Sequence, residues 1–155
     1  MPFSRESLNE IWRRSGGEQA ECFTCGKKCK DGWSLDGSHL DHEKNHGYDD
    51  PSRGVLECLW CHLKRHAELY YKYAYNRDKR RLRDTKYACL ALINRILAGE
   101  DIYNRGPQIR SRADIKQARK EIVALLNEVY KEQRKKVGRS DRAKEKFEEL
   151  VNMAR

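Results

Sequence analysis

The sequence predicts an α+β fold, mostly α, with a cysteine-rich N-terminal half and an all-helical C-terminal half. Between Cys22 and Cys61, most cysteines and histidines lie among Gly, Asp, Asn and Ser, which is typical of tight loops and short strands. From Leu59 onward, apolar residues recur at steps of three and four, the period of amphipathic helices. Only 38% of residues are hydrophobic and 37% are charged, so the core is thin and something besides apolar burial must help to stabilise it.

The N-terminal half should contain one helix followed by short strands. Residues 4 to 14 are expected to be helical, with Ser4 as N-cap, Phe3 and Leu8 at hydrophobic-staple positions, and Gly16 and Gly17 at the end. Strand pieces are predicted at residues 33 to 35 and 38 to 42. Asp36-Gly37 between them favours a two-residue hairpin turn.

The C-terminal half should contain four helices. We expect one from residue 59 to about 83 and one from 85 to 98 that stops at Gly99. After a turn-rich stretch at 101 to 107, Ser111 should cap a long helix that ends at Gly138, with Asp114 at a capping-box position, and Ser140 should begin the last helix. Their apolar stripes could pack within the chain or against a second copy. We divide the chain into residues 1–84, a stapled core with the first helix, and residues 85–155, a helical extension for dimerisation and DNA binding.

Charge and cysteine usage narrow the class of protein. The net charge of +9 makes a polyanion, most often nucleic acid, the expected partner, although a merely solubilising surface is the alternative. No apolar run is long enough for a membrane span, and residues 1 to 6 do not resemble a secretory leader. We therefore expect a cytoplasmic protein without membrane partners, in which cysteines bind metal before they form disulfides.

Two cysteine pairs have the spacing of a zinc site. Cys22-x2-Cys25 and Cys58-x2-Cys61 can each place two thiolates on a tight turn, and two such turns complete a tetrahedral Zn²⁺ site. The alternatives are free buried cysteines or a redox pair. Cys25 could also pair with Cys29, but Cys22 with Cys25 is favoured because Gly26 permits the tight backbone. Cys89 lies in a helical stretch and is expected in the core.

Chemistry-bearing residues stand between and just after these pairs. Hydrolysis of a phosphodiester needs a base near neutral pH, which histidine supplies, and a hard cation, which a carboxylate and neutral donors can hold. Asp41 and His42, together with His62 directly after Cys61, offer such a set. An Asp-His pair in a loop is usually a solvated turn, and only the flanking cysteine pairs make it a candidate site. The roles of His39, His46 and His66 stay open between site residues and ordinary structural ones.

Together these residues resemble the HNH (ββα-metal) nuclease motif over residues 20 to 66. More narrowly, His39-Leu40-Asp41-His42 with Arg53-Gly54-Val55-Leu56 and the Cys58 pair resembles the phage recombination endonuclease VII group, which cuts branched DNA such as Holliday junctions as dimers. The resemblance implies that Asp41 and His62 bind a catalytic Mg²⁺ or Mn²⁺ and that His42 activates water. It also implies a homodimer and, for a phage protein, the host cytoplasm. This chain differs from the group in having His62 where Asn is usual and one extra residue, Glu57.

Basic residues interleaved with tyrosines follow the last cysteine pair. The cations could neutralise backbone phosphates, and the tyrosine hydroxyls could add contacts unless the tyrosines are core residues. A second basic run covers residues 134 to 142. The nucleic-acid-binding residues that we predict are Lys64, Arg65, His66, Arg77, Lys79, Arg80 and Arg81.

The sequence therefore predicts a metal-dependent DNA endonuclease, with three alternatives. A nicking or site-specific HNH endonuclease would act on ordinary duplex DNA. A zinc-stapled DNA-binding protein would not need Asp41 and His42 beside His62. A structural interaction protein would use the helices and leave the metal-ligand set unexplained.

Overall fold

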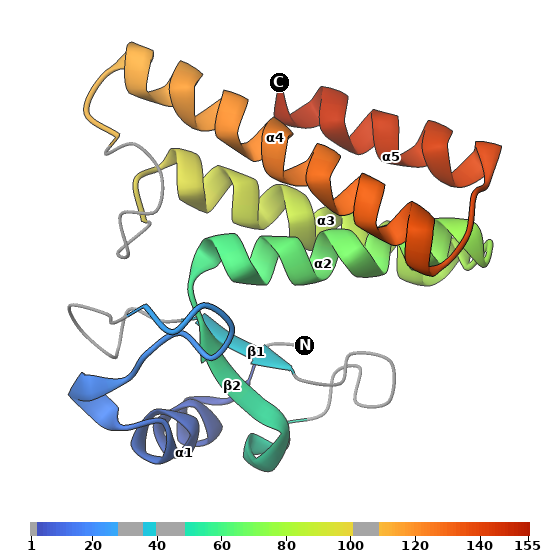
Figure 1. Cartoon of the computed structure of the whole chain (residues 1–155). Helices are drawn as coiled ribbons and strands as arrows, with labels where there is room; N and C mark the ends of the chain where they lie inside the picture. Colours follow the sequence, from blue (N-terminus) through green and yellow to red (C-terminus); the bar gives the residue numbers. More distant parts are fainter. Residues whose placement is uncertain (1–2, 28–35, 40–48, 101–108) are drawn as a thin grey trace. The chain divides into compact units, whose positions relative to one another are not determined.

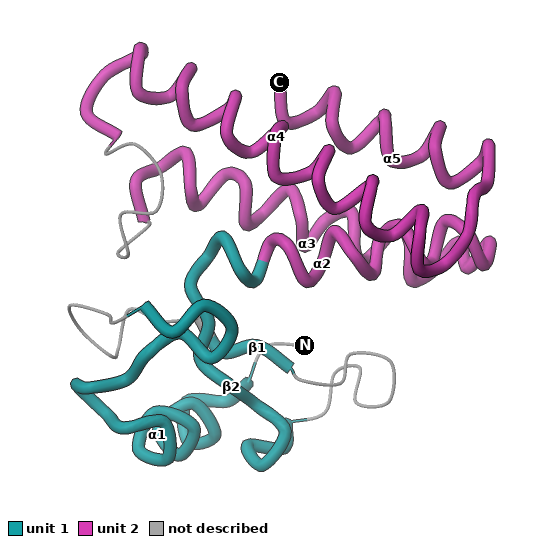
Figure 2. The backbone as a smooth tube through the Cα atoms, viewed as in Figure 1, with its two compact units in different colours: residues 1–62 teal, residues 63–155 magenta. Residues whose placement is uncertain are grey.

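The computed structural model describes residues 3–27, 36–39, 49–100 and 109–155 (Figure 1). Across these ranges the chain forms five α-helices and one two-stranded antiparallel sheet, which agrees with the predicted α+β, mostly α class. The chain divides into two compact units, residues 1–62 and residues 63–155 (Figure 2). The boundary falls inside helix α2 (Leu59–Tyr75), whereas the sequence suggested a division after residue 84.

The first unit is built around helix α1 (Arg5–Arg14) and a sheet of β1 (Asp36–His39) and β2 (Gly54–Glu57). Ser4 caps α1 as predicted, because its hydroxyl accepts a hydrogen bond from the backbone N–H of Ser7 at 3.2 Å. The fully buried Ile11 and the guanidinium of Arg14, which donates to the carbonyl oxygen of Gly54 at 2.5 Å, attach α1 to the sheet. Two short 3-10 helices, η1 (Gly17–Gln19) and η3 (Pro51–Arg53), complete the described part of this unit.

The predicted turn at Asp36-Gly37 is wrong. Both residues belong to β1, where Asp36 pairs with Glu57 and Gly37 pairs with Leu56. The glycine is explained by close packing, since a Cβ atom on Gly37 would lie 2.6 Å from Cδ2 of Leu8 and 3.2 Å from Cδ2 of Phe3. The side chains of Phe3 and Leu8 therefore pack against β1 at Gly37. Of the predicted strand residues, 33–35 and 40–42 lie outside the described ranges, while Ser38 and His39 are in β1.

The second unit is helical. It contains most of α2 together with α3 (Lys79–Leu97), α4 (Arg112–Lys136) and α5 (Asp141–Ala154). Figure 1 shows α4 and α5 side by side and running in opposite directions, and both contact α3. Ser111 and Ser140 cap α4 and α5 as predicted, and Gly99 and Gly138 have the positive φ angles that end a helix.

Packing within the single chain buries the apolar stripes of the last two helices. The residues concerned are at most 6% exposed; they are Ala118, Ile122, Leu126, Val129, Phe147, Leu150 and Val151. These side chains stabilise the monomer, so a second copy is not needed to cover them. No helix in the described parts of the chain is long and apolar enough to cross a membrane.

The predicted boundary between the helices 59 to 83 and 85 to 98 is wrong, because the break lies at residues 76 to 78 and α3 continues through residue 84. α2 ends at Tyr75, Arg77 adopts a left-handed conformation with φ of 57°, and Asp78 caps α3 by accepting from the N–H of Arg81 at 3.2 Å. Residues 76 to 81 are all polar, so the three- and four-residue apolar period is interrupted at the break. Asn76 and Asp78, residue types that favour turns and caps, are the local signal for the break.

Candidate functional site

The four cysteines of the two predicted pairs come together in the first unit. The sulfur atoms of Cys22, Cys25, Cys58 and Cys61 all lie within 4.8 Å of one another. Three of the four residues are buried and Cys25 is half-buried. A tetrahedral zinc site with Zn–S bonds of about 2.3 Å needs sulfur atoms roughly 3.8 Å apart, so the cluster has suitable dimensions. The four cysteines can hold a metal ion such as zinc.

The first pair lies on a tight turn. Gly26 donates its backbone N–H to the carbonyl oxygen of Cys22 at 2.9 Å, and the N–H of Cys22 donates to Lys27 at the same distance. Gly26 has a φ of 72°, and no atom lies within 4 Å of the position that a Cβ atom would take. The left-handed backbone, and not a lack of space, therefore requires glycine here. Phe23 N–H donates to the carbonyl oxygen of Leu56, which attaches this turn to β2.

The second pair lies at the junction of β2 and α2. Cys58 directly precedes α2, and its sulfur accepts a hydrogen bond from the N–H of Cys61 at 3.5 Å, in the manner of an N-cap side chain. The N–H of Cys58 in turn donates to the sulfur of Cys22 at 3.4 Å. Donors from the backbone and the positive end of a helix both favour thiolate sulfur.

The thiols of the cluster affect one another's ionisation. The pKa of Cys22 is lowered, chiefly because the thiols of Cys58 and Cys61 donate hydrogen bonds to its sulfur. The pKa of Cys61 is raised, because its hydrogen bonds with Cys22 and Cys58 hold its proton and burial adds to the effect. Negative charge is thus favoured on one sulfur and opposed on its neighbour. A divalent cation removes this opposition, because metal binding deprotonates cysteine ligands.

A buried carboxyl lies beside the cluster. Glu57, the last residue of β2, is fully buried, and the hydroxyl of Thr24 donates a hydrogen bond to its carboxyl group. Thr24 belongs to the turn of the first cysteine pair, and Glu57 is adjacent to Cys58 in the chain. This bond therefore joins the two cysteine pairs. The sequence showed Glu57 only as one extra residue, because Thr24 and Glu57 meet only when the turn of the first cysteine pair packs against β2.

The predicted catalytic pair, Asp41 and His42, lies outside the described residues, as do Cys29 and His46. The chain on either side of this segment is anchored in the first unit. His39 pairs with Gly54 at the end of β1, and the carboxylate of Asp49 accepts the N–H of Ser4 at 2.9 Å. This hydrogen bond is the main reason why the pKa of Asp49 is lowered.

The described histidines differ in their surroundings. His39 is 7% exposed and stacks on Phe3, with ring centroids 4.0 Å apart, so it packs in the core of the first unit. His62 is half-buried in the first turn of α2, where its N–H donates to the carbonyl oxygen of Cys58. α2 begins at Leu59, three residues before His62, as the apolar period predicted. His66 is buried four residues further along the same helix.

The predicted nucleic-acid-binding residues do not form one strip. Arg77, Lys79 and Arg80 are exposed at the turn between α2 and α3. Arg81 there pairs with Asp78 at 3.6 Å and stacks over the ring of Tyr73. Lys64, on the earlier part of α2, instead pairs with Glu132 of α4 at 3.9 Å. Because α2 ends at Tyr75, the cations after it lie on a separate element from Lys64.

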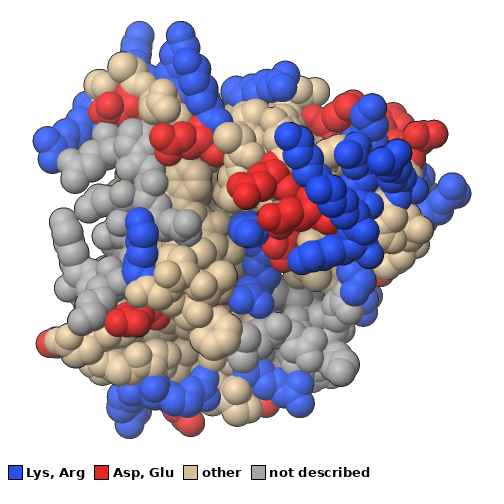
Figure 3. All heavy atoms as spheres, in the orientation of Figure 1, with Lys and Arg blue, Asp and Glu red and all other residues tan. Residues whose placement is uncertain are grey.

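Three tyrosines of α2 are buried in the core of the helical unit. Tyr70, Tyr71 and Tyr73 are at most 3% exposed, so they do not interleave with the cations on the surface. The hydroxyl of Tyr70 donates to the carbonyl oxygen of Lys146 at 3.0 Å, and that of Tyr71 donates to Gly138 at 2.7 Å. On the face drawn in Figure 3, Lys and Arg side chains gather over the end of the helical unit where α4 turns into α5, beside a group of Asp and Glu side chains.

Comparison of the chain with protein-family models, curated proteins and solved structures finds no match.

Proposed function

We propose that this protein is a metal-dependent DNA endonuclease with a zinc-stapled ββα core of the HNH type. The observation that carries the proposal is the cysteine cluster at the junction of β2 and α2, in the element order β1, β2, α2. Asp41 and His42 follow β1 in the sequence, and His62 stands in the first turn of α2, directly after a cysteine of the cluster. This order of elements and residues supports the resemblance to HNH nucleases.

In this proposal the zinc ion is structural. Bound by Cys22, Cys25, Cys58 and Cys61, it fixes the start of α2 and with it the backbone of His62. The set of four thiolates fits a closed site, which leaves no coordination position for a substrate. The hydrolytic chemistry therefore needs a second set of ligands, which the cysteines do not provide.

Asp41 and His62 are the ligands that we propose for the second cation, Mg²⁺ or Mn²⁺. When bound there, a divalent cation stabilises the charge that develops on the phosphate and on the leaving oxygen. His42 accepts a proton from the attacking water as the oxygen of that water bonds to phosphorus. The P–O bond to the leaving strand then breaks, and the leaving oxygen takes up a proton from water to become a hydroxyl. A carboxylate and two imidazoles suit these roles near neutral pH.

The exposed cations at the turn from α2 to α3 support DNA as the substrate. Arg77, Lys79 and Arg80 can neutralise backbone phosphates without reading base sequence. The resemblance to the endonuclease VII group is the basis for proposing branched DNA as the preferred substrate. We propose a homodimer because two strands must be cut by one site per chain. Arg81 belongs to the same proposed surface. Lys64 and Arg65, on the earlier part of α2, are proposed as a separate contact to the DNA backbone, and the buried His66 is left out of both.

A cleavage assay tests the proposal. The full chain is incubated with a four-way junction and with linear duplex of matching sequence, with and without Mg²⁺ or Mn²⁺. We expect metal-dependent cleavage that His42→Ala and Asp41→Ala abolish while the zinc content stays unchanged. Glu18→Ala, which removes an exposed carboxylate of the same unit, is the matched control.

Substrate and variant together separate the alternatives. Equal cleavage of junction and linear duplex would favour a nicking or site-specific endonuclease and remove the branched-DNA assignment. DNA binding without cleavage, unchanged in Asp41→Ala and His42→Ala, would indicate a zinc-stapled binding protein. Absence of DNA affinity at low salt would contradict both the nuclease and the DNA-binding protein. The remaining alternative would then be a structural interaction protein.

A further inference from the structure

A positively charged pocket lies in the helical unit, remote in sequence from the cysteine cluster. It has a volume of about 290 Å³ and is lined mainly by the first halves of α3 and α5, with Tyr70 from α2. Five cationic side chains and one acidic side chain line it: Lys79, Arg83, Lys86, Arg142, Lys146 and Glu149. We call these six residues and the space between them the basic pocket. It joins members of the two basic runs that are separate in the sequence.

Several of these cations are available to a ligand. Lys146 pairs with Glu149 at 3.6 Å, and Arg83 pairs with the neighbouring Asp84 at 3.5 Å. Within the described parts of the chain, Lys79, Lys86 and Arg142 have no acidic partner. The pocket therefore keeps a surplus of positive charge that surface ion pairs do not cancel.

Arg142 gives a second, independent indication of an anion. Its Nε atom is buried and has no hydrogen-bond acceptor among the described residues. A buried donor without an acceptor is destabilising, and an anion in the pocket would correct this if the guanidinium turned towards it. Arg142 and Lys79 also stand in the first turns of α5 and α3, where helix N-termini favour negative charge.

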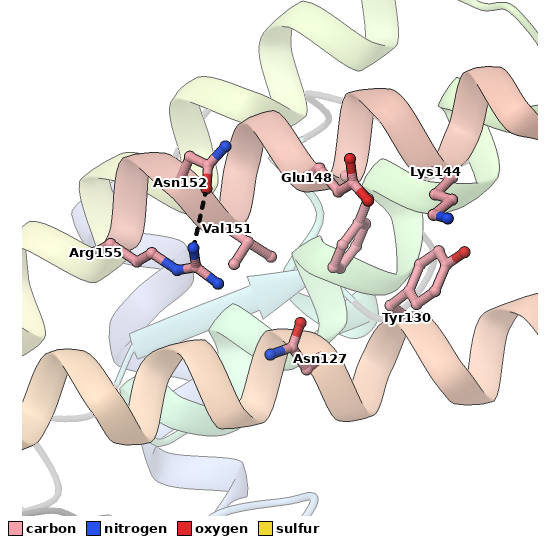
Figure 4. A pocket seen from close by; sticks show the side chains of 8 residues that line it. Asn127, Tyr130, Lys144, Glu148, Val151, Asn152 and Arg155 are labelled. Carbon is pink, nitrogen blue, oxygen red and sulfur yellow. Dashed lines mark hydrogen bonds between the residues drawn. The ribbon is translucent and has the colours of Figure 1, made fainter.

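An exposed aromatic ring lies at the same pocket. Tyr87 of α3 lines it and is 64% exposed, the largest value among the described large hydrophobic residues. Cationic grooves with exposed aromatic rings are typical of sites for single-stranded nucleic acid, where bases stack on the rings. The larger cavity between α4 and α5, about 350 Å³, lacks this pattern. There Lys144 and Glu148 have opposite charges, and Arg155 donates to Asn152 (Figure 4).

We propose that the basic pocket binds a backbone phosphate of a nucleic-acid strand, with an unpaired base of the same strand stacked on Tyr87. The inference goes beyond the proposed nuclease activity. It concerns the helical unit alone and requires no cleavage. For a protein that acts on branched DNA, it supplies a contact to unpaired nucleotides at a branch.

The test is a binding titration that does not depend on cleavage. Fluorescence anisotropy is measured on the full chain with a labelled oligothymidylate and with a blunt duplex, without Mg²⁺, over a range of salt concentrations. The variants are Lys86→Gln, Arg142→Gln, Tyr87→Ala and Tyr87→Trp. Lys116→Gln, an exposed lysine of α4 that does not line the pocket, is the matched control, and circular dichroism checks the fold of each variant.

We expect Lys86→Gln and Arg142→Gln each to lower the slope of log affinity against log salt by about 0.7 for the single strand. Tyr87→Ala should weaken single-strand binding by about fivefold to 100-fold and duplex binding little, and Tyr87→Trp should retain it. Affinities and slopes equal to those of Lys116→Gln in every pocket variant would overturn the proposal. Displacement of the strand by thymidine monophosphate at an equal phosphate concentration would overturn the assignment to a strand.

The cleavage and binding assays fail independently. A chain that binds oligothymidylate through the basic pocket but cuts no DNA would contradict the proposed nuclease and support the pocket. If the variants Lys86→Gln, Arg142→Gln and Tyr87→Ala cut junctions and bind single strands as well as the parent chain does, the result would support the nuclease and contradict the pocket.

Discussion

Removal of the metal from the four-cysteine cluster should unfold the first unit and leave most of the helical unit folded. Structural zinc sites contribute apparent free energies of about 10–16 kcal/mol at neutral pH. At about 0.05–0.15 kcal/mol per residue, a unit of residues 1–62 has a total stability of only about 3–9 kcal/mol. The loss therefore exceeds what the remaining contacts of this unit can supply.

Two optical signals separate the units. All three tryptophans, Trp12, Trp33 and Trp60, fall in the first unit, and Trp60 is only 7% exposed. Most of the helix belongs to the second unit, where α3, α4 and α5 have 19, 25 and 14 residues, against 10 in α1. A zinc chelator should shift tryptophan emission to longer wavelength while most of the ellipticity at 222 nm remains.

Variants make this prediction specific to the cluster. Cys61→Ser should resemble the chelated protein without any chelator and bind less than one zinc ion per chain. Cys89→Ala should bind zinc and respond to chelator like the parent chain, because Cys89 is buried in α3 outside the cluster. Unchanged tryptophan emission after complete removal of zinc, shown by elemental analysis, would refute the reasoning.

Three further changes test the packing of each unit. Gly54→Ala should destabilise the first unit by about 1–3 kcal/mol in urea unfolding followed by tryptophan emission, because the added Cβ meets the fully buried side chain of Ile11; an unchanged midpoint would contradict the packing. Tyr71→Phe should cost the helical unit about 0.5–1.5 kcal/mol in thermal unfolding followed by ellipticity, since it removes the hydrogen bond to Gly138, and no loss would mean that water replaces that bond. Glu68→Gln should stabilise the helical unit at pH 7, because burial raises the pKa of Glu68 and so disfavours its charged form in the folded state. The gain in Tm over the parent should shrink as the pH falls through the folded pKa towards the ordinary value for glutamate, and a gain independent of pH would refute this cause.

Local signals in the sequence predicted most helix ends, except the break between α2 and α3, where the signals of Asn76 and Asp78 were missed. Ser4, Ser111 and Ser140 are N-caps, and Gly99 and Gly138 end helices, as expected. These features depend on a few neighbouring residues, so the sequence contains all the information needed. The cysteine cluster was also predicted correctly, because the chemistry of a tetrahedral metal site requires two close pairs whatever lies between them.

The other errors arose where distant parts of the chain decide the local structure. Asp36-Gly37 looked like a turn, but pairing with Leu56 and Glu57 makes it a strand. Glu57 looked like an insertion, yet it is fully buried and bonded to Thr24. Long-range pairing of this kind leaves no periodic signal within the segment itself. The roles of Asp41 and His42 stay predictions, since both lie outside the described residues.

The pairing of His39 with Gly54 has a consequence for engineering this chain. The polypeptide leaves the sheet after one partner and returns at the other, so the two ends of the stretch 40–53 are already held side by side. The entropy of closing a loop grows only slowly with its length, by about 0.6 kcal/mol for each doubling. Lengthening this stretch should therefore cost the first unit little stability, as long as Asp49 and Pro51 keep their hydrogen bonds to Ser4 and Arg14.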